Sequence, residues 1–216
     1  MKVYAFESED WAEAAQHGVT PEKAVEAIER GLSETKNLLP TLSDYINVVV
    51  RPNDSGIMPE TGTGAYTHDS EFIEITIDKT VPHGAEDMLK SLYEIPFHEG
   101  NHAARYNVVP YDDRFIVSAI YEGLATVFER EYSGYKPPYG NYEDDETMAK
   151  WFEELKTADW GQRSEMMFMT KDNRRWVGYK TGTWLVDKAI KNSGKSIVEL
   201  TTLPADDIFK FAGVEV

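Results

Sequence analysis

Two histidines and a glutamate lie close together in the segment FHEGNHAAR, at positions 97–105. His98, Glu99 and His102 match the pattern H-E-x-x-H. On a helix, residues four apart lie about one turn apart on the same face, so both imidazoles could bind one metal ion. Glu99 would lie about 100° around the helix from His98, where its carboxylate can reach a water on the metal without displacing it. These residues therefore predict metal-assisted proton transfer.

The pattern needs a helix, and the neighbouring residues favour one. Ala103 and Ala104 are good helix formers. An apolar stripe lies upstream, formed by Met88, Leu89, Leu92 and Tyr93. We predict a helix over 86–106, with a kink or a restart at Pro96. The alternative is a pair of surface histidines on an amphipathic helix, but we interpret His98 and His102 as zinc ligands and Glu99 as the general base.

A third ligand must come from elsewhere, because catalytic zinc typically takes three protein ligands and keeps one position for water. The next predicted helix covers 113–132, and its apolar side chains occupy more than half of its circumference. Glu122 lies on the remaining stripe, among small side chains. A carboxylate there needs a partner, because an unpaired buried charge is costly. That partner could be a zinc ion or a buried arginine, for which Arg105 is the candidate.

H-E-x-x-H followed by a glutamate on a second helix resembles the gluzincin metallopeptidases, of which thermolysin is the familiar member. Nineteen residues separate His102 from Glu122, the spacing expected of thermolysin-like enzymes. More closely, the chain is similar to a bacterial family of predicted zinc-dependent proteases without an assigned function. The similarity covers most of the chain and is strongest in FHEGNHAAR, YEGLATVFE and GYKTGTWLVDKAIKNSGKSIVELTTLPADDI.

This resemblance implies Zn²⁺ as the cofactor, with His98, His102 and Glu122 as its ligands and Glu99 as the base. It also implies that EFIEITID is an edge strand along which an extended peptide pairs. Thermolysin-like enzymes often carry an aspartate one turn after the ligand glutamate, where this chain has Thr126. Another group, such as a backbone carbonyl, must then orient His98. The chain is also much shorter than those enzymes, so their substrate range does not carry over.

A hydrolase of this kind needs a hydrogen-bond donor that stabilises the oxyanion, usually Tyr, His or Arg. We predict Tyr179, because the segment GYKTG belongs to the region of resemblance and opens a helix. Gly178 and Gly182 are four apart on that helix and would permit close helix packing. The alternative for Tyr179 is an ordinary core position, and His68 and Arg175 are the rival donors.

The remaining patterns predict an α+β fold, with a small N-terminal β-sheet followed by a mainly helical C-terminal part around a zincin-like core. Glu71–Asp78 alternates apolar and polar residues, as a half-buried strand does. The segment containing Gly56, Gly62 and Gly64 lacks the spacing of a phosphate-binding loop and is interpreted as a turn. Strand YINVVV is expected at 45–50, and further helices at 21–37, 145–157, 176–192 and after Pro204.

Composition limits the classes of function. The chain has 216 residues, 41% of them hydrophobic, which suits a single domain over 1–216, or two small domains at most. It has no cysteine, and its formal net charge is −16, which disfavours binding to nucleic acids and to anionic membranes. The N-terminal residues lack a secretory signal pattern, so a cytoplasmic location is expected.

Together these features predict a zinc metallopeptidase that hydrolyses peptide bonds in peptide or protein substrates. The alternative is a metal-binding or protein-interaction module without hydrolytic activity, in which the acidic surface or a partner matters more.

Overall fold

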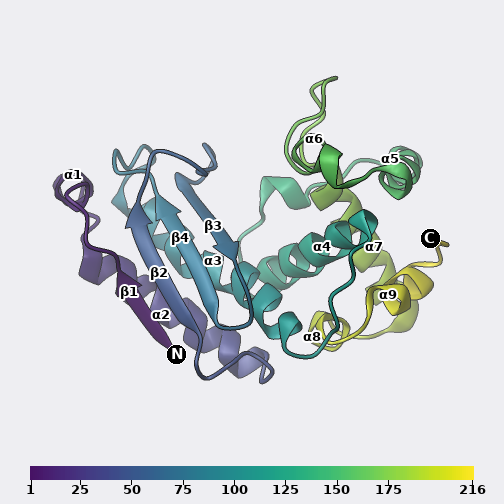
Figure 1. Cartoon of the computed structure of the whole chain (residues 1–216), viewed down its shortest axis with the longest axis horizontal. Coiled ribbons are helices and arrows are strands. Elements are labelled where there is room, and N and C mark those ends of the chain that lie inside the picture. The colour runs from purple at the N-terminus through teal and green to yellow at the C-terminus, as the bar shows by residue number, and fades with distance from the viewer. The chain divides into compact units, whose positions relative to one another are not determined.

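Short apolar strands build a four-stranded mixed sheet near the N-terminus in the computed structural model, which describes residues 1–216 (Figure 1). The strands are β1 (Lys2–Ala5), β2 (Asn47–Pro52), β3 (Thr63–Thr67) and β4 (Phe72–Ile77), in the order β1-β2-β4-β3. Strands β1, β2 and β4 are parallel, and β3 runs antiparallel to β4. The alternation in β4 is confirmed, because Ile73, Ile75 and Ile77 are all buried.

The prediction that EFIEITID forms an edge strand is wrong. Strand β4 lies between β2 and β3, and β3 forms that edge of the sheet. Alternation of apolar and polar residues shows that one face of a strand is buried. It does not show whether other strands pair with it on one side or on both sides. Strand β3 falls in the segment interpreted as a turn, because Gly64 weakens the strand pattern. A Cβ on Gly64 would lie 1.8 Å from the carbonyl oxygen of Gly56, so the strand needs glycine there.

Helices α2 (Pro21–Leu38) and α3 (Ala85–Tyr106) cover one face of the sheet, and the short helix α1 (Trp11–Gln16) lies near β2 (Figure 1). Helices α2 and α3 approach closely at two glycines. A Cβ on Gly31 would lie 2.1 Å from the Tyr93 carbonyl oxygen, and one on Gly100 would lie 2.7 Å from Thr35 Cγ2. Helix α3 continues through Pro96 without a restart. The close approach fixes the part of α3 that carries H-E-x-x-H.

The second half of the chain is helical, as predicted. Its helices are α4 (Phe115–Tyr132), α5 (Asp145–Thr157), α6 (Arg163–Met167), α7 (Val177–Ser193), α8 (Ile197–Thr201) and α9 (Ala205–Ala212), with the 3-10 turns η1 (Pro138–Gly140) and η2 (Trp160–Gln162). Helices α4 and α7 pack with their backbones almost in contact. A Cβ on Gly182 would lie 1.8 Å from the Ala119 carbonyl oxygen. Gly178 instead lies against the side chain of Met167.

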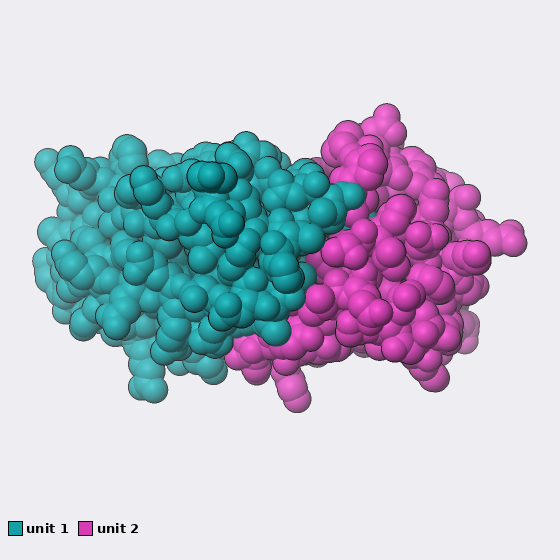
Figure 2. Space-filling model, turned by 90° about the horizontal axis from the view of Figure 1, so that it is seen from below, with its two compact units in different colours: residues 1–108 teal, residues 109–216 magenta.

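The chain therefore has the predicted α+β fold, with the sheet early and helices late. It divides into two compact units, Met1–Val108 and Val109–Val216 (Figure 2). The expectation of one domain over 1–216 stays a prediction. None of the helices is both long and apolar enough to cross a membrane.

Candidate metal centre

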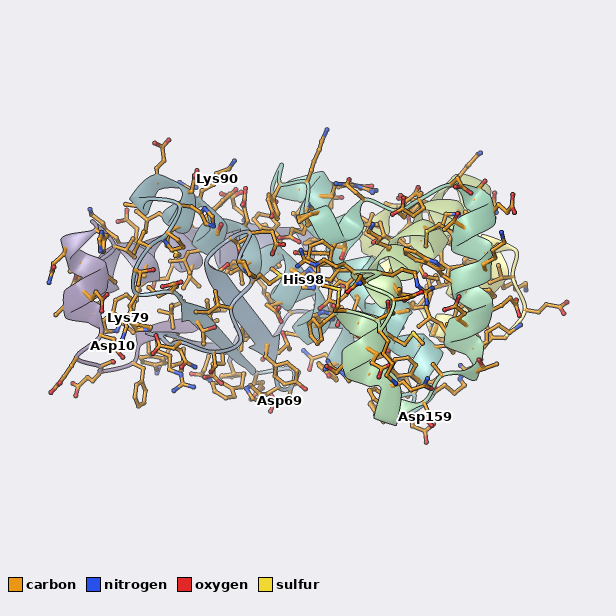
Figure 3. The ribbon with its side chains drawn as sticks, turned by 90° about the horizontal axis from the view of Figure 1, so that it is seen from above. Asp10, Asp69, Lys79, Lys90, His98 and Asp159 are labelled. Atoms are coloured by element: carbon orange, nitrogen blue, oxygen red, sulfur yellow. The ribbon has the colours of Figure 1, made fainter.

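Helix α3 places the two histidines of H-E-x-x-H side by side. The centroids of the His98 and His102 rings are 5.0 Å apart, and the ring planes meet at 73°. His98, labelled in Figure 3, is buried and His102 is half-buried. Their helix is anchored through buried apolar side chains, among them Met88, Leu92 and Phe97. Two imidazoles on successive turns can contribute nitrogen donors to one ion.

Glu99, between these histidines in sequence, is held from the edge strand β3. The carboxylate of Glu99 is buried, with 8% of the residue exposed. The Thr67 hydroxyl lies 2.6 Å from Oε2 of Glu99 and 3.0 Å from the Glu99 carbonyl oxygen. The role of Thr67 could not be predicted from the sequence, because the contact joins residues 32 apart and depends on the position of β3 beside α3. No local pattern around Thr67 indicates it.

Helix α4 carries Glu122, which is half-buried and precedes Gly123. The same helix buries a second carboxylate, Glu129, with 2% of the residue exposed. The hydroxyl of Tyr139 donates a hydrogen bond to Oε2 of Glu129 at 2.8 Å. Burial first, and then the nearby charge of Glu129, raise the pKa of Tyr139 well above its ordinary value. This buried pair is not evident from the sequence, because Tyr139 lies beyond the end of α4.

The candidate oxyanion donors lie in different settings. Tyr179 is on the first turn of α7, half-buried, with its ring 5.2 Å from the ring of Tyr139. His68 follows β3 and stacks on Phe72 at 4.8 Å. The guanidinium of Arg175 lies 3.8 Å above the ring of Trp176. Each of the three candidates therefore contacts an aromatic ring, and the choice of Tyr179 stays a prediction.

The donor chemistry fits zinc. His98, His102 and Glu122 offer two imidazole nitrogens and a carboxylate oxygen, the ligand types that catalytic zinc takes in proteins. A helix that carries two imidazoles and an adjacent carboxylate base is typical of zinc-dependent hydrolases. Because Glu99 is buried beside its own hydrogen-bond donor, its carboxylate is already oriented.

Comparison with known proteins agrees with that class. The chain belongs to the family described as "Predicted Zn-dependent protease (DUF2268)", which it matches over residues 25–210. This range contains α3, α4 and α7 and so includes every candidate site residue. No curated protein matches the chain. No solved structure matches it either.

Proposed function

We propose that the protein is a gluzincin-type zinc peptidase that cleaves peptide bonds, with Zn²⁺ held by His98, His102 and Glu122. The observation that carries the proposal is the arrangement on α3, where two neighbouring imidazoles accompany the buried, hydrogen-bonded carboxylate of Glu99. Membership of the family described as a predicted zinc-dependent protease supports it. Zinc at this site supplies Lewis-acid chemistry, polarising a carbonyl and lowering the pKa of water towards about 7.

The side chains of the protein have separate roles in this proposal. The Glu99 carboxylate takes the proton of the attacking water and passes it to the leaving amine. Tyr179 donates its phenolic hydrogen to the oxygen that becomes negatively charged on the scissile carbonyl. Glu122 is a ligand and takes no proton.

We further propose that an extended peptide pairs with β3, in place of the strand expected from sequence. Backbone hydrogen bonds join His68 to Phe72 and Asp78 to Gly62 at the two ends of the β3–β4 pair. In an antiparallel ladder, hydrogen-bonded pairs alternate with non-hydrogen-bonded ones. The even-numbered residues of β3 therefore bond β4, while the backbone groups of Ala65 and Thr67 point to the open edge. These groups can bond an added strand, which is a known mode of peptide recognition.

Metal content and a peptide-library cleavage profile, measured on the same sample, test the proposed function. We expect about one zinc per chain, from the three ligands of a single site, and cleavage of some library peptides that a chelator abolishes. A protein purified without chelators that holds no transition metal, and cannot be loaded with one, would overturn the proposal. Stoichiometric zinc without turnover would favour a metal-binding module instead.

A further inference from the structure

We infer that Thr67 is a positioning residue for the general base, which it holds from the edge strand that receives the substrate. The inference rests on the proposed function and goes beyond it, because it assigns a role to a side chain outside H-E-x-x-H. The Thr67 residue is 5% exposed, and its hydroxyl lies 2.6 Å from Oε2 of Glu99. The Thr67 hydroxyl donates this hydrogen bond and the carboxylate oxygen accepts it.

Strand geometry explains why Thr67 can serve both the base and the strand edge. Side chains alternate along β3, so Thr63, Ala65 and Thr67 share one face, and Tyr66, which is exposed, lies on the other. Helix α3 packs against β3. The Thr67 side chain thus reaches Glu99 while its backbone groups point along the plane of the sheet to the open edge. Thr67 would therefore contact both a peptide paired at this edge, through its backbone, and the Glu99 carboxylate, through its side chain.

The hydrogen bond has a purely structural alternative. The Thr67 hydroxyl also lies 3.0 Å from the Glu99 carbonyl oxygen, and a hydroxyl has only one hydrogen to donate. If it bonds the carbonyl, Thr67 ties β3 to α3 without acting on the base. The contact with the carboxylate oxygen, at 2.6 Å, is shorter than the contact with the carbonyl oxygen, at 3.0 Å. The geometry therefore favours the bond to the carboxylate.

Kinetics of zinc-loaded variants distinguish the two roles. Thr67→Val removes the hydroxyl and keeps the shape and the backbone, so we expect kcat to fall about 10- to 100-fold while KM and zinc content stay near wild type. Thr67→Ser restores a hydroxyl and should recover most of the rate. Thr63→Val is the matched control, because it removes another buried hydroxyl of the same face, one that bonds Thr61 and not the site. A rate for Thr67→Val equal to that of Thr63→Val would overturn the inference.

A second measurement needs no activity and uses the full chain with its metal removed by a chelator. Thermal melts of Thr67→Val, Glu99→Leu and the double variant form a cycle. If the hydroxyl bonds the carboxylate, Thr67→Val should lower the melting temperature by several degrees in the wild type and far less beside Glu99→Leu. An equal decrease in both backgrounds would assign the hydroxyl to the backbone carbonyl and overturn the inference. If wild type shows no peptidase activity, the proposed function fails, whereas this cycle still tests the bond.

Discussion

Glu99 and Glu122 carry the same functional group, but they have different roles in the proposed site. Glu99 lies on α3 with its carboxylate bonded by Thr67, and Glu122 lies on α4. A base must exchange a proton with the substrate, whereas a ligand must keep its charge toward the metal. Replacing each carboxylate therefore separates catalysis from metal binding.

We expect Glu99→Gln to keep zinc and to lose nearly all hydrolysis, because an amide of the same shape cannot take the proton. Glu122→Ala should lower zinc affinity by a large factor, since it removes one of three protein ligands. The measurement is a zinc titration of both variants, with peptide hydrolysis followed on the same samples. Equal zinc affinities for the two variants would show that one of these roles is wrongly assigned.

At the scale of elements, the contact between α4 and α7 depends on glycine. Gly182→Ala would place a methyl group 1.8 Å from the backbone oxygen of Ala119, which cannot move without shifting α4. Overpacking usually costs about 1–3 kcal/mol. We expect about 3 kcal/mol or more here, measured by urea unfolding, because the obstacle is backbone.

Gly178→Ala is the control on the same helix, in its first turn, where the gain in helix propensity is smaller than at the interior position of Gly182. Its new methyl would meet Sδ of Met167 at 2.3 Å, the far part of a flexible side chain. We expect a change in unfolding free energy within about 1 kcal/mol. Similar losses for both variants would contradict a specific role of Gly182 in bringing the two helices together.

A polar cluster also joins elements of the helical unit. Arg130 on α4 forms two hydrogen bonds with Asp187 on α7, at 3.1 and 2.6 Å. The Tyr142 hydroxyl donates to the same aspartate at 3.1 Å. Burial first, and then Asp187, raise the pKa of Tyr142 to about 12 from its ordinary 10.0. The folded chain therefore holds this phenolic proton more tightly than the unfolded chain does.

Linkage gives the sign of the resulting pH dependence. Because the pKa of Tyr142 is higher in the folded chain, its protonated hydroxyl contributes fully to the free energy of unfolding below pH 10. This contribution is lost as the pH rises towards about 12. Urea unfolding between these pH values should show a steeper loss of stability in wild type than in Tyr142→Phe, which has no phenolic proton. The effect should be small, because Tyr142 is 37% exposed. Equal slopes for the two proteins would contradict the raised pKa.

At the scale of the whole molecule, the proposed metal should contribute to the stability of the folded chain. The formal net charge of −16 suits a cationic ligand such as a metal ion. Some of the carboxylates form local ion pairs, for example Asp10 with Lys79 at 3.0 Å (Figure 3). A metal that binds the folded chain and not the unfolded one stabilises by RT ln(1 + [L]/Kd).

Chelation should therefore lower the melting temperature markedly in wild type. It should do so far less in Glu122→Gln, where the ligand charge is gone and zinc binds weakly. Thermal melts of both proteins, with and without chelator, make the measurement. If Glu122 instead pairs with a buried arginine such as Arg105, the mutation itself should destabilise strongly and the chelator shift should persist. If the chelator lowers the melting temperature equally in the two proteins, Glu122 is not a ligand of the metal.

Local patterns in the sequence predict much of this molecule. The 3.6-residue periodicity gives α3, α4, α5 and α7 within a few residues, and the period-2 alternation gives β4. These periodicities can be recognised without tertiary information, because each element buries apolar residues whichever elements it packs against. The proximity of His98 and His102 is likewise predictable, because their spacing within one helix is enough to bring the two imidazoles together.

Only the tertiary structure decides the order of the strands and the surroundings of Glu99. The alternation of apolar and polar residues in β4 would be the same at the edge or in the interior of the sheet. Its position beside β3 therefore could not be predicted from its own residues. Strand β3 was not predicted, because Gly64 weakens its strand pattern. Glycine is needed there because the backbone of Gly56 lies close to it. The contact of Thr67 with Glu99 depends on the position of β3 beside β4 and on the approach of the Gly56 backbone to Gly64. Lateral pairing and close backbone approach depend on distant partners, and no local periodicity encodes them.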